Sequence, residues 1–250
     1  MTFENFFYIF YSLIQGITEF IPISSSGHLN LMELIGAKLE KRNFLYETSA
    51  HFASLLALLL YLFKNKHFDL STIKNISYPV FFATIPALIL GFIMIVLKID
   101  IISLKIIAFS SIFGGVMLYI SDLENYKKFN IKNITLKFFL AGLFQCLAFI
   151  PGFSRSGSCI IAFRLLGEKR KTSSIYSLYL GIPIIFLSFL SNIRNLDIII
   201  LDLNLVIIFF VTFITAYTTL VLFIKFIEKI SFAPFVIYRI LLGIIVLTIF

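Results

Sequence analysis

The chain has 250 residues, of which 60% are hydrophobic and only 14% are charged, and its formal net charge is +8. A soluble domain carries about a quarter charged residues, so this composition excludes a soluble enzyme and indicates one integral membrane domain over residues 1–250. Cytoplasmic loops rich in Lys and Arg explain the positive charge. No basic patch with interleaved aromatic residues indicates a nucleic-acid partner.

The first element, about residues 3–20, is an apolar helix with a polar stretch at its end, QGITEFIPISSSGH, which begins at Gln15. Gln15 and Glu19 are four residues apart and share a helix face. Pro22 removes an N–H donor and stops the helix. Serine N-caps then start a second helix, 26–36, which is too short to cross about 30 Å of hydrocarbon. The two elements are predicted to form a re-entrant hairpin.

The turn of this hairpin is predicted to be an anion site, because the free N–H groups and the positive dipole end of a helix meet there. A polar loop in which the serines only cap a helix is the alternative. Ionisable groups inside a membrane segment are costly, which favours the functional interpretation. Three apolar spans follow, at about 47–63, 77–97 and 104–121, and 122–137 is the longest polar connection.

The opening pattern then recurs. A helix from about 134 to Ile150 is followed by PGFSRSG and by a short helix that ends at Gly167. Gln15 and Gln145 are 130 residues apart, and the glycines of the two turns have the same spacing. Three more spans are expected at about 173–190, 204–224 and 232–250. The chain therefore divides into two related halves, about 1–121 and 134–250.

Three spans separate the two hairpins, so the second hairpin enters from the opposite face of the membrane. The predicted fold is an all-α polytopic membrane protein with six transmembrane helices, two re-entrant helical hairpins and an inverted-topology repeat. Thirteen Lys and Arg residues fall in loops on one side and six on the other. The positive-inside rule then places both termini outside the cytoplasm.

The two turns together carry the residues of a phosphate site. Arg155 lies between two serines at the start of a half-helix, and its fork suits phosphate oxygens, although a structural counter-ion for Glu19 is the alternative. His28 follows the first serines closely enough to exchange a proton with Ser24 or Ser25. Glu19 has three open roles: to orient His28, to act as a base, or to hold a divalent cation.

Other polar residues carry weaker signals. His51 is interpreted as a polar lining residue. Ser177 occupies the corresponding place in the second half and is a candidate to line the same cavity. Arg239, in the last span, is interpreted as a structural residue that either forms an ion pair or extends its charged end to the membrane surface.

These motifs resemble those of a known family. QGITEFIPISSSGH resembles the first signature of the bacterial undecaprenyl-diphosphate phosphatase (bacitracin-resistance) family, and PGFSRSGS resembles its second. LLG and LGIPI after the second motif, and YRILLG near the C-terminus, agree with the same family. The resemblance spans the whole chain.

The resemblance implies hydrolysis of undecaprenyl diphosphate to undecaprenyl phosphate and phosphate, which recycles the lipid carrier of cell-wall synthesis. It assigns catalytic places to Glu19, Ser25, His28 and Arg155, with Ser25 as the nucleophile. Direct attack by a water molecule that Glu19 or His28 activates is the alternative. The phosphate-binding residues are then Ser24, Ser26, Gly27, Ser154, Ser156 and Gly157. It also implies a divalent cation, Mg²⁺ or Ca²⁺, near Glu19 and Gln15, and a multi-pass protein of the bacterial inner membrane whose active site opens to the outer face.

The sequence departs from the family pattern at three positions. Gln15 stands where a glutamate is common, which leaves a metal with one carboxylate fewer. Cys159 replaces a threonine and His51 a glutamine. A lipid-phosphate transporter or flippase is the main alternative function, because inverted repeats are a transporter architecture. The isoprenoid length, the metal and a homodimer stay open.

Overall fold

The structure is a computed structural model, and it describes residues 3–35, 44–67, 69–99, 101–123, 129, 131–193 and 203–249. Within these ranges the regular structure is entirely helical. In chain order the elements are α1 (Phe3–Thr18), α2 (Ser25–Ile35), α3 (Phe44–Lys64), α4 (Leu70–Val96), α5 (Leu104–Asp122), α6 (Ile134–Gln145), the 3₁₀ turn η1 (Cys146–Phe149), α7 (Arg155–Leu165), α8 (Arg170–Ile193), α9 (Leu203–Ile227) and α10 (Ala233–Ile249). The prediction of an all-α protein is confirmed.

Five of these helices, α3, α4, α5, α8 and α9, are long and apolar enough to cross a membrane. They correspond to five of the six predicted spans, and the protein is therefore a multi-pass membrane protein. The sixth predicted span, 232–250, falls on α10, which is apolar but has 17 residues.

Helix α4 begins seven residues before the predicted span of 77–97. Asp69 caps it, because its carboxylate accepts a hydrogen bond from the backbone N–H of Thr72 at 2.8 Å. A hydrogen bond from the side chain of Thr72 lowers the pKa of the exposed Asp69 carboxyl group most, and this backbone hydrogen bond and the hydroxyl of Ser71 lower it further. Hydropathy detects where an apolar run begins, whereas a capped helix also includes polar turns outside that run.

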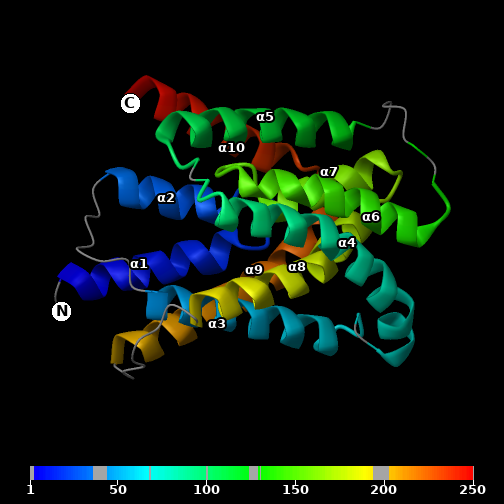
Figure 1. Cartoon of the computed structure of the whole chain (residues 1–250), viewed down its shortest axis with the longest axis horizontal. Coiled ribbons are helices and arrows are strands. Elements are labelled where there is room, and N and C mark those ends of the chain that lie inside the picture. The colour runs from blue at the N-terminus through cyan, green and yellow to red at the C-terminus, as the bar shows by residue number, and fades with distance from the viewer. Residues whose placement is uncertain are drawn as a thin grey trace.

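Two helical hairpins lie at the centre of the bundle (Figure 1). α1 and α2 enter from the side on which both ends of the chain lie, and α6, η1 and α7 enter from the opposite side. Their turns meet between the long helices. The predicted helix from 134 to Ile150 ends earlier, at Gln145, because the chain tightens into η1 before Pro151.

Several charged residues used to argue orientation lie outside the described residues. They are Lys38, Lys41, Arg42, Lys127, Lys128 and Arg194.

Candidate active site

The two central turns have the same local geometry. Ser24 and Ser154 both have a positive φ, 76° and 79°, which is unusual for a residue other than glycine. The hydroxyl of Ser24 accepts a hydrogen bond from the N–H of Gly27 at 3.2 Å, and Ser154 accepts one from Gly157 at 3.1 Å. Each hydroxyl therefore caps a half-helix and brings its first N–H groups toward the middle of the bundle.

The two turns are also in contact with each other, as the inverted arrangement predicts. A Cβ on Gly27 would lie 3.0 Å from the Cα of Gly152, so any larger residue would require the two turns to move apart by a few tenths of an ångström. The hydroxyl of Ser156 donates to the carbonyl of Ile21 at 2.9 Å. Residues 125 and 135 apart in the chain are thus held in contact.

Glu19 is the centre of a hydrogen-bond network between the turns. Its Oε2 accepts from the hydroxyl of Ser25 at 2.8 Å and from the amide of Gln15 at 3.0 Å. Its Oε1 lies 3.0 Å from a guanidinium nitrogen of Arg155, and both side chains of this ion pair are nearly buried. The other guanidinium nitrogen of Arg155 donates to the carbonyl of Ser177 at 3.4 Å.

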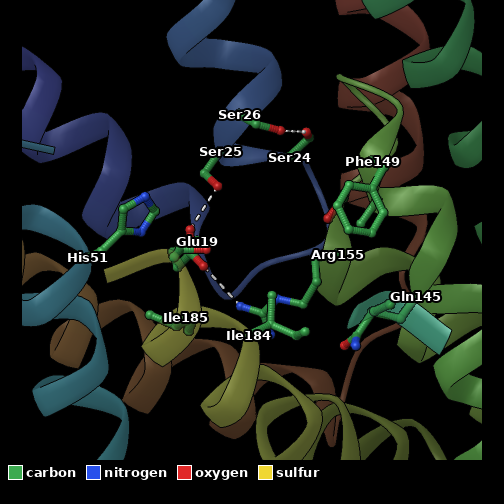
Figure 2. A pocket seen from close by; sticks show the side chains of 14 residues that line it. Glu19, Ser24, Ser25, Ser26, His51, Gln145, Phe149, Arg155, Ile184 and Ile185 are labelled. Carbon is green, nitrogen blue, oxygen red and sulfur yellow. Dashed lines mark hydrogen bonds and ion pairs between the residues drawn. The ribbon is translucent and has the colours of Figure 1, made fainter. Parts of the chain in front are cut away.

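This network forms one wall of a pocket of about 170 Å³ (Figure 2). Predicted site residues that line it are Glu19, Ser24, Ser25, Ser26, Ser154 and Arg155. Helices α3, α4 and α8 close the remaining sides with His51, Ala87, Ile184, Ile185 and Ser188. A hydroxyl against a carboxylate, with an arginine on the same carboxylate, can bind an anion and activate the hydroxyl.

His28 does not line this pocket, and the structure does not bring it to the Ser25 hydroxyl. Its Nδ1 is 2.6 Å from the main-chain carbonyl of Ser24, so Nδ1 carries the proton and donates it. Its Nε2 therefore accepts from the hydroxyl of Tyr238, and the two rings are stacked. The predicted proton exchange with a serine side chain is replaced by a contact with the main chain.

Three other predicted phosphate-binding residues lie behind the pocket wall. Gly27 and Gly157 supply the capped N–H groups, and the hydroxyl of Ser156 is hydrogen-bonded to a carbonyl. Ser177 is not among the residues that line the pocket. Its carbonyl accepts a hydrogen bond from Arg155, and its hydroxyl donates to the carbonyl of Ser174. His51 does line the pocket, as predicted.

The donor set does not fit a metal held by the protein alone. Both oxygens of Glu19 are engaged, and one of them faces the positive charge of Arg155. Gln15 donates its amide N–H to Glu19 rather than offering an oxygen. In the part of the chain that the structure describes, no group of three or more His, Cys, Asp or Glu residues could hold a metal ion.

Sequence reasoning missed three residues that line the pocket from the second hairpin, Gln145, Ala148 and Phe149. Their signal was the internal repeat, because Gln145 corresponds to Gln15, Ala148 to Glu19 and Phe149 to Phe20. Arg239 is fully buried, and it donates hydrogen bonds to backbone carbonyls of both turns and of α5 rather than to carboxylates. It is a structural residue, as interpreted, with carbonyls in place of an ion-pair partner.

A multi-pass helical bundle with a buried serine–carboxylate–arginine pocket defines a membrane protein that binds an anionic group between its helices. The chain matches the family described as bacitracin resistance protein BacA over residues 8–245, and it belongs to that family.

Curated relatives agree over almost the whole chain. The undecaprenyl-diphosphatase of Sulfurihydrogenibium sp. (strain YO3AOP1) is 36% identical over 242 residues, which cover 93% of this chain and 94% of the relative. The undecaprenyl-diphosphatase of Pelagibacter ubique (strain HTCC1062) is 36% identical and covers 95% of this chain and 94% of the relative. That of Wolinella succinogenes is also 36% identical and covers 98% of this chain and 97% of the relative.

Proposed function

We propose that this protein hydrolyses undecaprenyl diphosphate to undecaprenyl phosphate and phosphate. The observation that carries the proposal is the 2.8 Å hydrogen bond from the Ser25 hydroxyl to Glu19, in a pocket that also contains Arg155. Membership of the BacA family and the names of its relatives supply the substrate. Such a reaction returns the lipid carrier of cell-wall synthesis to use and counters bacitracin.

In the first step the Ser25 oxygen attacks the terminal phosphorus and its proton passes to Glu19 Oε2. The bond from that phosphorus to the bridging oxygen breaks, and undecaprenyl phosphate leaves with the bridging oxygen. Arg155 still has N–H donors beyond those that bind Glu19 and Ser177, because a guanidinium has five. These donors stabilise the charge on the transferred phosphoryl group.

In the second step water attacks the phosphoserine, and Glu19 returns its proton to the Ser25 oxygen. The phosphorus–serine bond breaks, phosphate is released, and both side chains regain their starting states. Glu19 is thus the base of the first step and the acid of the second. His28 acts through the main chain of Ser24, which it holds by a hydrogen bond.

An apolar groove between α4 and α8 suits the isoprenoid tail of this substrate. It is lined by Ile76, Val80, Phe81, Ile182, Phe186 and Leu187, among other residues, with almost no polar surface. Both helices also contribute to the phosphate pocket, through Ala87, Ile184 and Ser188. A lipid diphosphate can therefore lie with its head in the pocket and its tail along the groove.

The positions of the phosphate pocket and the apolar groove along the helices support an active site that opens to the outer face of the inner membrane. His51 and Ser188 lie near the ends of α3 and α8 that share a side with both chain termini (Figure 1). The groove continues from there toward the opposite, cytoplasmic side. This is the orientation of a lipid in the outer leaflet.

We also propose that the fold is the inverted repeat with six spanning helices, α10 being the sixth, and two re-entrant hairpins. Support comes from the matching turns at Ser24 and Ser154 and from the opposite entry of the hairpins (Figure 1). The flippase alternative gains less support, because a carrier needs binding groups but no hydroxyl activated by a carboxylate.

Phosphate release from undecaprenyl diphosphate by the purified protein in detergent tests this function. We expect Ser25→Ala to lower release by more than about 10²-fold while it leaves binding of the lipid nearly unchanged, because the hydroxyl acts only in bond formation. Thr248→Ala, which removes an exposed hydroxyl at the far end of α10, is the control. The proposal fails if the wild-type protein moves the lipid across a membrane and releases no phosphate.

The implied divalent cation stays a prediction, and chelation tests it. Since the described residues form no metal site by themselves, we expect Mg²⁺ or Ca²⁺ to enter as a counter-ion of the diphosphate. EDTA should then lower phosphate release and leave the thermal unfolding midpoint of the substrate-free protein unchanged. A midpoint that falls on chelation would instead indicate a resident metal.

A further inference from the structure

Gln145 is the last residue of α6, and its side chain reaches the phosphate pocket from the second hairpin (Figure 2). Only 1% of this residue is exposed. Its Oε1 accepts a hydrogen bond from the thiol of Cys159 at 3.3 Å, which orients the amide. Its Nε2 is buried and has no hydrogen-bond partner among the residues that the structure describes.

The internal repeat explains why this donor is free. Gln15, the equivalent residue of the first hairpin, donates its Nε2 to Glu19 at 3.0 Å. In the second hairpin Phe149-Ile-Pro151 repeats Phe20-Ile-Pro22, so the position equivalent to Glu19 is Ala148, whose side chain offers no acceptor. One glutamine amide is therefore used inside the protein, and the other points unused into the pocket.

A buried donor without a partner destabilises a folded protein, and such donors are accordingly rare. An acceptor brought by a ligand removes this penalty. The ligand of this pocket is a diphosphate. Its ionised oxygens accept hydrogen bonds and do not donate them. Gln145 thus offers a neutral donor next to the cationic donors of Arg155.

The position of Gln145 indicates which phosphoryl group it contacts. Figure 2 shows its amide near Arg155 and Ile184, on the opposite side of Arg155 from Ser25. Ser25 must face the terminal phosphorus that it attacks. Ile184 lies in α8 next to Pro183, which lines the apolar groove. The phosphoryl group on the groove side is the one attached to the isoprenoid.

We propose that Gln145 binds the lipid-linked phosphoryl group of the diphosphate and so makes the pocket specific for two linked phosphoryl groups. This inference rests on the proposed function for the identity of the substrate. The donor stabilises the leaving group as its bond to the terminal phosphorus breaks, because negative charge increases there.

The test is Gln145→Met, which keeps the length of the side chain and removes both N–H donors. We expect kcat/KM for undecaprenyl diphosphate to fall about 10- to 100-fold, the usual effect of one hydrogen bond to a charged group. The unfolding midpoint of the substrate-free variant should be unchanged or higher, because no Nε2 hydrogen bond is lost. Asn65→Leu is the matched control, because this amide donates to Tyr61 away from the pocket.

Two non-hydrolysable anions identify the subsite through protection against thermal unfolding. For Gln145→Met, methylenediphosphonate should bind about tenfold more weakly than to the wild-type protein, while inorganic phosphate should bind within twofold of it. Gln145→Glu, which places an anion at the same point, should weaken methylenediphosphonate further.

The inference is overturned if Gln145→Met lowers the unfolding midpoint and leaves both kcat/KM and methylenediphosphonate binding within twofold of the wild-type values. That result would assign Gln145 a structural role alone. If the wild-type protein hydrolyses no lipid diphosphate, the proposed function fails, and protection by methylenediphosphonate still tests Gln145 separately.

Discussion

At the scale of single residues, the site depends on how the charge of Glu19 is shared. Its carboxylate accepts from Gln15, Ser25 and Arg155, which belong to three different helices. Burial of a charge is costly unless it is paired and hydrogen-bonded, and here both conditions are met. The same bonds hold the Ser25 hydroxyl in one direction, toward the base and next to the arginine.

The role of His28 can be tested at the same scale. We expect His28→Gln to keep substantially more phosphate release than His28→Ala, because a glutamine amide can donate to the Ser24 carbonyl in place of Nδ1. Turnover of the purified variants on undecaprenyl diphosphate is the measurement. If both variants lose more than about 10²-fold, the size of a general acid–base effect, then His28 transfers a proton itself.

At the scale of helices, the pocket exists because two short helices begin inside the bundle. Each is preceded by a serine at positive φ, a conformation that costs about 1–3 kcal/mol and persists only where the surroundings enforce it. Helix α8 is part of these surroundings. It packs along α7, and its Gly181 lies directly against the guanidinium of Arg155.

We therefore expect Gly181→Ala to impair activity without changing any polar group. A Cβ on Gly181 would lie 2.1 Å from a guanidinium nitrogen of Arg155, so the side chain of Arg155 must move by an ångström or more. A displacement of this size costs about 10²-fold in rate. The kcat on undecaprenyl diphosphate should fall accordingly, with a small change in the unfolding midpoint.

Ser191→Ala, near the other end of α8 and exposed, is the control for this helix. Wild-type turnover in Gly181→Ala would mean that Arg155 is not held in its working position by α8.

At the scale of the whole molecule, one buried arginine connects the two hairpins to the outer helices. Arg239 of α10 is 0% exposed. It donates to carbonyl groups of the first turn, the second turn and α5, namely those of Pro22 (3.3 Å), Gly152 (3.1 Å), Phe153 (2.7 Å), Ser110 (3.4 Å) and Ser111 (3.2 Å). A guanidinium can satisfy so many acceptors because its donors form a planar fork.

Arg239→Lys should reduce stability and activity together. A lysine keeps the charge but has three donors at one point, so it must lose at least two of these bonds, each worth about 1.5–3 kcal/mol to a charged donor. We expect a loss of about 3 kcal/mol or more in the free energy of unfolding, seen as a lower unfolding midpoint in detergent. Phosphate release should fall because the turns are no longer held together.

Lys225→Arg, an exchange at an exposed position near the end of α9, should leave both quantities unchanged. An unfolding midpoint of Arg239→Lys equal to that of the wild-type protein would show that the turns are held together by packing alone.

The sequence by itself determined the class of protein and the residues at the centre of the site. Apolar runs of about 20 residues indicate spanning helices wherever they occur. Gln15 and Glu19 share a face, and a break at Pro22 precedes a serine cap, because helix geometry acts within about four residues. The same local rules, applied twice, located both turns and predicted that they face each other.

Only the tertiary structure decided which side chains from the rest of the chain contact these turns and line the pocket between them. His28 contacts Tyr238, 210 residues away, instead of a serine hydroxyl three or four residues away. Gln145 and Ile184 enter the pocket from α6 and α8. No local period encodes such contacts, because they depend on how helices distant in the chain rotate and pack against one another.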